Sequence, residues 1–186
     1  PGLYAAGDCT DQPEFVYVDG AEGGTGAAPA EFMDHIGAPL RQGLVLVRNA
    51  LVGCGLKDEI RLAASGKQIS AFAMAASMAL GADWINTARG FMFSLGCIQS
   101  LNCHKNTCPT GIATTNPSRQ SGLVVSDKAE RVYNFHRNTV RALMEVVGAA
   151  GCSHPSELTP RHIMHRVTED ITEPGHIAYK LLKPGV

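Results

Sequence analysis

The chain has 186 residues, of which 45% are hydrophobic and 18% are charged, and its formal net charge is −1 at pH 7. This balance provides no electrostatic attraction for nucleic acid or for an anionic membrane, so neither is expected as a partner. Apolar runs fall short of the roughly 18 residues that span a bilayer, and Pro1-Gly2-Leu3 is not a basic leader. Six cysteines are too few for a disulfide scaffold. These features predict a globular cytoplasmic protein.

The first stretches of the chain combine an irregular lead-in with a strand and a glycine-rich segment. Residues 1–14 are rich in Pro, Gly and Asp, which indicates a surface lead-in. The apolar run at 15–19 predicts a buried parallel strand. In the glycine-rich segment at 20–29, successive backbone N–H groups can form an anion-binding nest. A long flexible loop has the same composition, so both interpretations stay open for this segment.

Helix and strand patterns then alternate. Residues 39–52 carry apolar side chains at helical spacing, with Pro39 at the start and glycines after the end, which predicts an amphipathic helix. Residues 60–65 predict a second strand. Ser70 is expected to cap a second helix, whose buried face would include Phe72.

A third strand is expected at 83–88, and it leads into Arg89-Gly90. Strands that alternate with helices in this way indicate a parallel sheet with crossover helices, and hence the α/β class.

Three of the six cysteines lie in one short loop at 96–111, with the spacing C-x5-C-x4-C at Cys97, Cys103 and Cys108. Asparagines, a proline directly after the third cysteine and glycines make this loop rich in turns, so it can direct several thiols at one centre. An iron–sulfur cluster on three thiolates fits this pattern. Zinc on the three cysteines and His104, or three inert thiols, are the alternatives.

The last third of the chain predicts one long helix and a tail. The helix is expected at about 127–147, with Ser126 as its cap and a buried apolar stripe. Residues 151–186 are expected to form an irregular tail with one short helix. His162 and His165 would lie one helical turn apart, on a solvated surface rather than around a metal.

The loops occur in a specific order: Gly-Gly-Thr-Gly-Ala-Ala-Pro at 23–29, Ser-Gly-Lys at 65–67, Ala-Arg-Gly at 88–90, then the cysteine loop. This combination resembles the FMN-binding synthase domain of the large subunit of glutamate synthase. It resembles more closely the shorter glutamate-synthase-like flavoproteins that lack the amidotransferase domain.

The resemblance covers residues 15–150 and implies the C-terminal part of a (β/α)8 TIM barrel. The three strands would be the sixth to eighth, with the cluster loop at 96–111. The implied division is a lead-in at 1–14, the half-barrel at 15–150 and the tail at 151–186. A full barrel needs roughly 250 residues, so only part of one is present here.

The resemblance also implies the cofactors FMN and a 3Fe-4S cluster. Phosphate sites in such barrels follow strands seven and eight. The implied FMN-binding residues are Gly23, Gly24, Thr25, Gly66, Lys67, Ala88, Arg89 and Gly90. The implied cluster ligands are Cys97, Cys103 and Cys108, whereas Cys9, Cys54 and Cys152 are expected to bind no iron.

The family's chemistry implies reductive synthesis of glutamate from 2-oxoglutarate and ammonia. Electrons from a donor protein or domain would pass through the cluster to FMN, which reduces a 2-imino acid. The catalytic residues would lie mostly on earlier strands, so none is assigned here. The chain departs from the family pattern at Ala21, Glu22 and Arg89, where the family has His, Asp and a small polar residue.

Two other functions remain open: a non-catalytic electron-transfer half-domain that works with a partner chain, and a phosphate-binding barrel of the inosine-monophosphate dehydrogenase kind with Cys97 as nucleophile. Three strand–helix units would leave two sheet edges unpaired and one sheet face partly exposed. We therefore expect the chain to be a truncated product, or another chain to supply the missing barrel half. The alternative is a homo-oligomer in which two copies pair by domain swapping. The exposed inner face is expected to comprise Val16, Val18, Leu62, Ala64 and Ile85.

Overall fold

The computed structural model describes residues 12–24, 28–29 and 31–183. Its centre is a three-stranded parallel sheet in the order β1-β2-β3. The strands are β1 (Phe15–Asp19), β2 (Arg61–Ser65) and β3 (Trp84–Ile85). The parallel α/β arrangement that the alternating pattern predicted is confirmed. The third strand is shorter than the predicted 83–88, because the chain turns into a helix at Arg89.

Two helices pack on one face of the sheet, α1 (Leu40–Gly53) and α2 (Ala71–Ala79). Ser70 caps α2 as predicted, since its hydroxyl accepts a hydrogen bond from the Ala73 N–H at 3.2 Å. The prediction for Phe72 is wrong, because this side chain is exposed and Met74 is buried instead. Two helices of about the predicted length therefore cover the sheet, which accounts for the hydrophobic spacing of their sequences.

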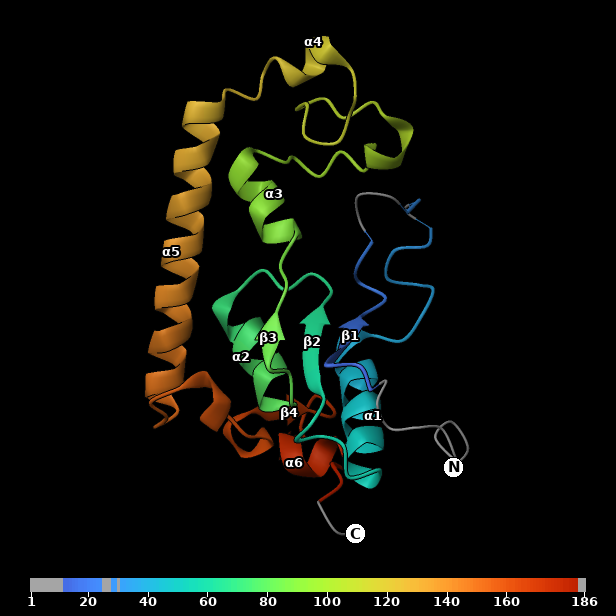
Figure 1. Ribbon diagram of the computed structural model, residues 1–186, viewed down its shortest axis with the longest axis vertical. Coiled ribbons are helices and arrows are strands. Elements are labelled where there is room, and N and C mark those ends of the chain that lie inside the picture. Colours follow the sequence, from blue (N-terminus) through green and yellow to red (C-terminus); the bar gives the residue numbers. More distant parts are fainter. Residues whose placement is uncertain (1–11, 25–27, 30, 184–186) are drawn as a thin grey trace.

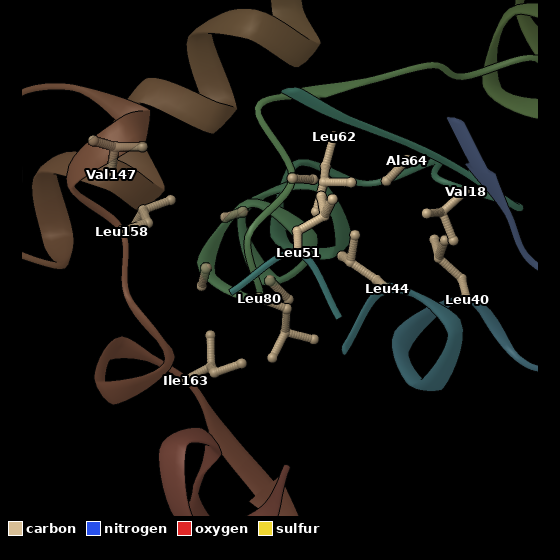
Figure 2. Packing of buried hydrophobic residues seen from close by; sticks show 14 of the residues in the cluster. Val18, Leu40, Leu44, Leu51, Leu62, Ala64, Leu80, Val147, Leu158 and Ile163 are labelled. Carbon is tan, nitrogen blue, oxygen red and sulfur yellow. The ribbon is translucent and has the colours of Figure 1, made fainter. Parts of the chain in front are cut away.

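The core lies between the sheet and these helices, and Figure 2 shows its side chains. Leu44 of α1 and Leu62 of β2 are fully buried, and Val18 and Ala64 lie in the same cluster. Successive side chains of a strand point to opposite faces, so Val16, Val18, Leu62, Ala64 and Ile85 belong to the helix-covered face. They do not form the exposed inner face that we predicted.

The other face of the sheet carries aromatic side chains. Phe15 is 50% exposed, Tyr17 44% and Trp84 36%, so β1 is not the buried strand that was predicted. The Phe15 and Trp84 rings meet edge to face with centroids 5.5 Å apart. The Tyr17 hydroxyl accepts a hydrogen bond from Asn86 Nδ2 at 2.9 Å. We call Phe15, Tyr17 and Trp84 the aromatic face.

Above the sheet in Figure 1 lie α3 (Arg89–Leu95), the cysteine loop with the short 3-10 helix η2 (Cys103–Lys105), and α4 (Pro117–Gln120). The long helix α5 (Val125–Ala149) runs along one side and contacts α2 and α3. Val124 is its N-cap residue, and no side chain caps it, so the predicted Ser126 cap is wrong.

The C-terminal region is ordered into short elements rather than an irregular tail, which corrects that prediction. An antiparallel ribbon forms from β4 (Met164–Arg166) and β5 (Thr172–Pro174). The other elements are η3 (Pro155–Glu157), η4 (Pro160–His162) and α6 (Gly175–Ala178). The region is anchored because Leu158 and Ile163 enter the core, and it lies at the end opposite the cysteine loop (Figure 1).

His162 and His165 lie in different elements, η4 and β4, so their predicted spacing along one helix is wrong. The His165 ring instead forms a hydrogen bond through Nδ1 with the Tyr179 hydroxyl at 3.1 Å. Within the described ranges, no helix has both the length and the hydrophobicity needed to cross a membrane.

Candidate functional site

Three of the segments singled out in the sequence meet at the carboxyl ends of the parallel strands. The turn after β1 is fastened to β2, because Gly20 N donates to Ser65 O at 3.0 Å and Ser65 Oγ donates to Asp19 Oδ1 at 2.7 Å. The chain turns after β2 at Gly66, and α3 begins just after β3. This edge is where ligands bind in α/β folds.

The glycines after β1 have structural reasons for their identity. A Cβ on Gly23 would lie 2.3 Å from Asp19 Oδ1, so a larger residue would have to displace the Asp19 carboxylate from the strand end. Gly24 has a φ of 70°. Glu22, one of the departures from the family pattern, accepts a hydrogen bond from Leu40 N at 2.9 Å and so caps the start of α1. Thr25 lies outside the described residues.

The turn after β2 is tight. Gly66 has a φ of 129°, and a Cβ there would lie 3.3 Å from Gly20 N. Lys67 has a φ of 44°, which is uncommon for a residue with a side chain. Its Nζ forms an ion pair with Asp34 from the segment after β1. The turn therefore brings a cation and close-packed backbone to the edge of the sheet.

The start of α3 places a buried cation at the same edge. Arg89 is only 6% exposed, so its side chain is buried and does not extend into solvent. Its Nη1 donates to Cys97 Sγ at 3.9 Å, while its Nε has no hydrogen-bond partner among the described residues. Ala88 is the N-cap residue of α3. A Cβ on Gly90 would lie 2.6 Å from Phe135 Cζ, so Gly90 lets α3 pack closely on α5.

A cavity of about 280 Å³ lies among these segments. It brings together two of the predicted FMN-binding residues and two residues of the cysteine loop. Its polar and loop residues include Asp34, His35, Lys67, Arg89, Gln99 and Leu101. Asp34, His35 and Gln99 were missed in the sequence analysis. Asp34 and His35 belong to no motif, Gln99 is only a spacer position between Cys97 and Cys103, and the folded chain alone brings them to this cavity.

The cysteine loop starts from a defined helix end. Gly96 has a φ of 104°, Gly96 N donates to Phe93 O at 2.9 Å, and Cys97 N donates to Met92 O at 3.0 Å. This pair of bonds is the Schellman motif, which makes Gly96 the turning residue and fixes the Cys97 backbone at the end of α3. Cys97 therefore has a defined place at the start of the loop.

Further along the loop, Asn106 has a φ of 58°, and its Oδ1 accepts a hydrogen bond from Thr115 N at 2.7 Å. Cys108 is buried. Burial raises the pKa of its thiol, but hydrogen bonds from the Thr110 hydroxyl and from nearby backbone N–H groups lower it more, to about 7. This environment favours the thiolate, which is the form that binds metals.

The structure places Cys97, Cys103 and Cys108 in one loop but does not gather their thiols. In the part of the chain that the structure describes, no group of three His, Cys, Asp or Glu side chains is arranged to hold a metal ion. The donor set fits a three-thiolate cluster in its chemistry, because three cysteines are present and Cys108 favours the thiolate. Cluster ligation by these cysteines stays a prediction.

Comparison with known proteins agrees with the resemblance. The family model described as the conserved region in glutamate synthase matches residues 2–153. The chain belongs to the glutamate synthase family. The chain is 42% identical over 154 residues to the glutamate synthase large subunit-like protein YerD of Bacillus subtilis. It is 36% identical over 147 residues to the archaeal glutamate synthase [NADPH] of Methanocaldococcus jannaschii.

The matches cover most of this chain but little of each relative. They include 83% of the chain and 29% of the Bacillus subtilis protein, and 79% of the chain and 29% of the archaeal protein. A glutamate synthase [NADPH] large chain of Bacillus subtilis is 30% identical over 171 residues, which is 87% of this chain and 11% of that protein. The chain thus spans less than a third of the length of these members of the glutamate synthase family.

Proposed function

We propose that this chain forms part of an FMN and iron–sulfur oxidoreductase of glutamate-synthase type, which reduces a 2-imino acid derived from 2-oxoglutarate and ammonia to glutamate. The observation that carries the proposal is the shared cavity of the β2 turn, the start of α3 and the cysteine loop, in a chain of this family. When bound, FMN would supply hydride transfer and the 3Fe-4S cluster one-electron transfer.

The charges of the cavity support a phosphate there. Two cations, Lys67 and Arg89, line it together with one carboxylate, Asp34. A buried guanidinium with a free N–H forms strong hydrogen bonds to phosphate oxygens. Backbone N–H groups near Gly66, Lys67, Ala88 and Gly90 would complete the phosphate site, and the turn at Gly23, Gly24 and Thr25 would lie beside the flavin or substrate.

Cys97, Cys103 and Cys108 would hold the cluster, and the loop at 96–111 would have to close further to bring the three thiols together. Residues 15–150 would form the C-terminal half of the barrel, after a lead-in at 1–14. Residues 151–186 would close the core at the far end of the sheet, which the burial of Leu158 and Ile163 supports.

The cofactor content of the chain, purified without oxygen, tests this proposal. We expect iron and sulfide in the proportion of a 3Fe-4S cluster, together with bound FMN. Iron without FMN would instead favour the electron-transfer half-domain. FMN or phosphate binding without iron would favour the phosphate-binding barrel with Cys97 as nucleophile. A chain that binds neither cofactor would contradict the proposal.

Substitution of Gly66 tests the phosphate site. We expect Gly66→Val to weaken FMN binding tenfold or more, about 1.4 kcal/mol. The new side chain would obstruct the backbone and would have to adopt a φ of 129°, which L side chains rarely adopt. Flavin titration measures the effect, and urea unfolding separates lost binding from lost stability. Gly53→Val is the matched control, since an added Cβ there meets no atom within 4 Å. Unchanged FMN affinity in the Gly66 variant would place the phosphate elsewhere.

The sheet offers surfaces for a partner. Within the described ranges, β1 and β3 each pair only with β2, and the aromatic face is exposed. An apolar cavity of about 480 Å³, lined in part by Met78, Trp84 and Phe135, lies beside β3. Unpaired strand edges can pair with strands of another chain, and large exposed apolar patches mark interaction sites. We propose that the missing barrel half, a partner chain or a second copy covers them.

Light scattering tests this surface. We expect the purified chain to have a mass above the 19.7 kDa of one copy, because the aromatic face and the free edges associate. Trp84→Lys should reduce the association, since it replaces an aromatic ring of this face by a charge. Phe32→Lys, at an exposed aromatic residue outside the strands, is the control. A folded, fully active monomer would contradict the half-barrel interpretation.

A further inference from the structure

Arg89 is a buried cation without a carboxylate partner among the described residues. It is 6% exposed, it forms no salt bridge within them, and its Nε lacks a hydrogen-bond partner there. A buried charge is costly unless other groups compensate it. The groups that the structure places near this guanidinium are therefore candidates for what it stabilises.

Among the described residues, the guanidinium makes a hydrogen bond and a cation–π contact, and both partners belong to α3 or its end. The Phe93 ring, one helical turn after Arg89, lies 5.9 Å from Arg89 Cζ, within range of a cation–π contact. Cys97 Sγ lies 3.9 Å from Arg89 Nη1. The side chain thus runs along α3, from its first residue to the cysteine that follows its last turn.

The Cys97 end of the contact with Arg89 is held in place by backbone hydrogen bonds. The Schellman bonds at Gly96 and Cys97 fix where the loop leaves α3, so the Cys97 thiol is presented on the side where the guanidinium lies. The Nη1 contact is long, but sulfur is large and diffuse, and the contact becomes charge-assisted when the sulfur is anionic. The Arg89 guanidinium, the Phe93 ring and the end of α3 at Gly96 together connect the cavity to Cys97, the first cysteine of the loop.

We propose that Arg89 is a positioning residue: it holds the Cys97 sulfur in place as the first cluster ligand, and it raises the reduction potential of the cluster. This inference rests on the proposed cluster. Reduction adds negative charge, which a nearby guanidinium stabilises, and hydrogen bonds to cluster sulfurs are known determinants of potential. The Arg89 Nε stays available to an oxyanion in the cavity, so one side chain would contact both cofactor sites.

The test uses the whole chain reconstituted anaerobically with iron and sulfide. Arg89→Gln removes the charge, Arg89→Lys keeps the charge without the planar fork, and Arg141→Gln removes a cation from the exposed surface of α5. For each variant, iron and sulfide content, the rate of iron loss to a chelator and the midpoint potential are measured. Thermal unfolding of the iron-free chains reports whether the variants fold.

We expect Arg89→Gln to lose iron about tenfold faster and to shift the one-electron equilibrium about tenfold toward the oxidised cluster, which is a potential lower by about 59 mV. Arg89→Lys should recover most of the potential but still lose iron faster than the original chain, and Arg141→Gln should match the original in both.

Unchanged iron loss and potential in a folded Arg89→Gln variant would overturn this inference and leave the proposed function standing. If that variant does not fold, Arg89→Lys decides, and iron loss equal to the original would overturn the inference. An original chain that takes up no iron would overturn both.

Discussion

Replacing Cys103 with Ser is expected to abolish iron binding by this chain. Cys103 is the middle cysteine of the C-x5-C-x4-C loop and begins η2, where it is partly exposed and free. A serine hydroxyl does not supply the thiolate that binds iron in such clusters. Iron, sulfide and visible absorbance of the anaerobically purified variant measure the effect, which should be a nearly complete loss.

Cys54→Ser is the matched control for this substitution. Cys54 is an exposed free cysteine that ends α1, away from the cysteine loop. We expect this variant to keep its iron and its absorbance. Equal iron loss from the two variants would show that the loop does not hold the cluster.

Replacing Leu62 with Ala should destabilise the fold by about 3 kcal/mol, within the range for a large buried side chain. Leu62 is fully buried in the central strand, where the cluster of α1 and α2 side chains surrounds it (Figure 2). Few atoms can move to fill the space, because strands pair with β2 on both sides. Urea unfolding followed by circular dichroism measures the change.

Leu46→Ala is the control for the core substitution. Leu46 lies on α1 and is 69% exposed, so its removal should change the free energy of unfolding by about 0.5 kcal/mol or less. A loss for Leu46→Ala as large as that for Leu62→Ala would contradict the assignment of the core. Both substitutions change the same residue type, so the comparison isolates burial.

Most elements follow from local signals in the sequence. Ser70 and the alanines after it predict α2, and the structure contains this helix with its cap. Pro39 and the apolar spacing predict α1 to within a residue at each end. In both cases the residues that decide the structure lie within one or two helical turns of each other, so pattern and propensity are sufficient.

Predictions failed where the sequence pattern allows either of two residues, or either of two faces, to be the buried one. Phe72 and Met74 both suit a buried helix position, and only packing on the sheet selects Met74. The two faces of the sheet were assigned the wrong way round for the same reason. Alternation places Val18 and Tyr17 on opposite faces but does not say which face the helices cover. The C-terminal ribbon was missed because its strands are three residues long, and tertiary contacts rather than propensity hold them.

The candidate site, too, was predicted only in part from the sequence. The order of the glycine turns and the cysteine loop, read along the chain, was enough to identify the glutamate synthase family, because this order depends on residue types alone. The ion pair of Lys67 with Asp34 and the contact of Arg89 with Cys97 were decided only by the tertiary structure. The first joins residues 33 positions apart in the sequence, and the second depends on a left-handed turn at Gly96 that directs the chain back toward a buried side chain. Local patterns specify which elements form, whereas the positions of side chains on different elements depend on how those elements pack.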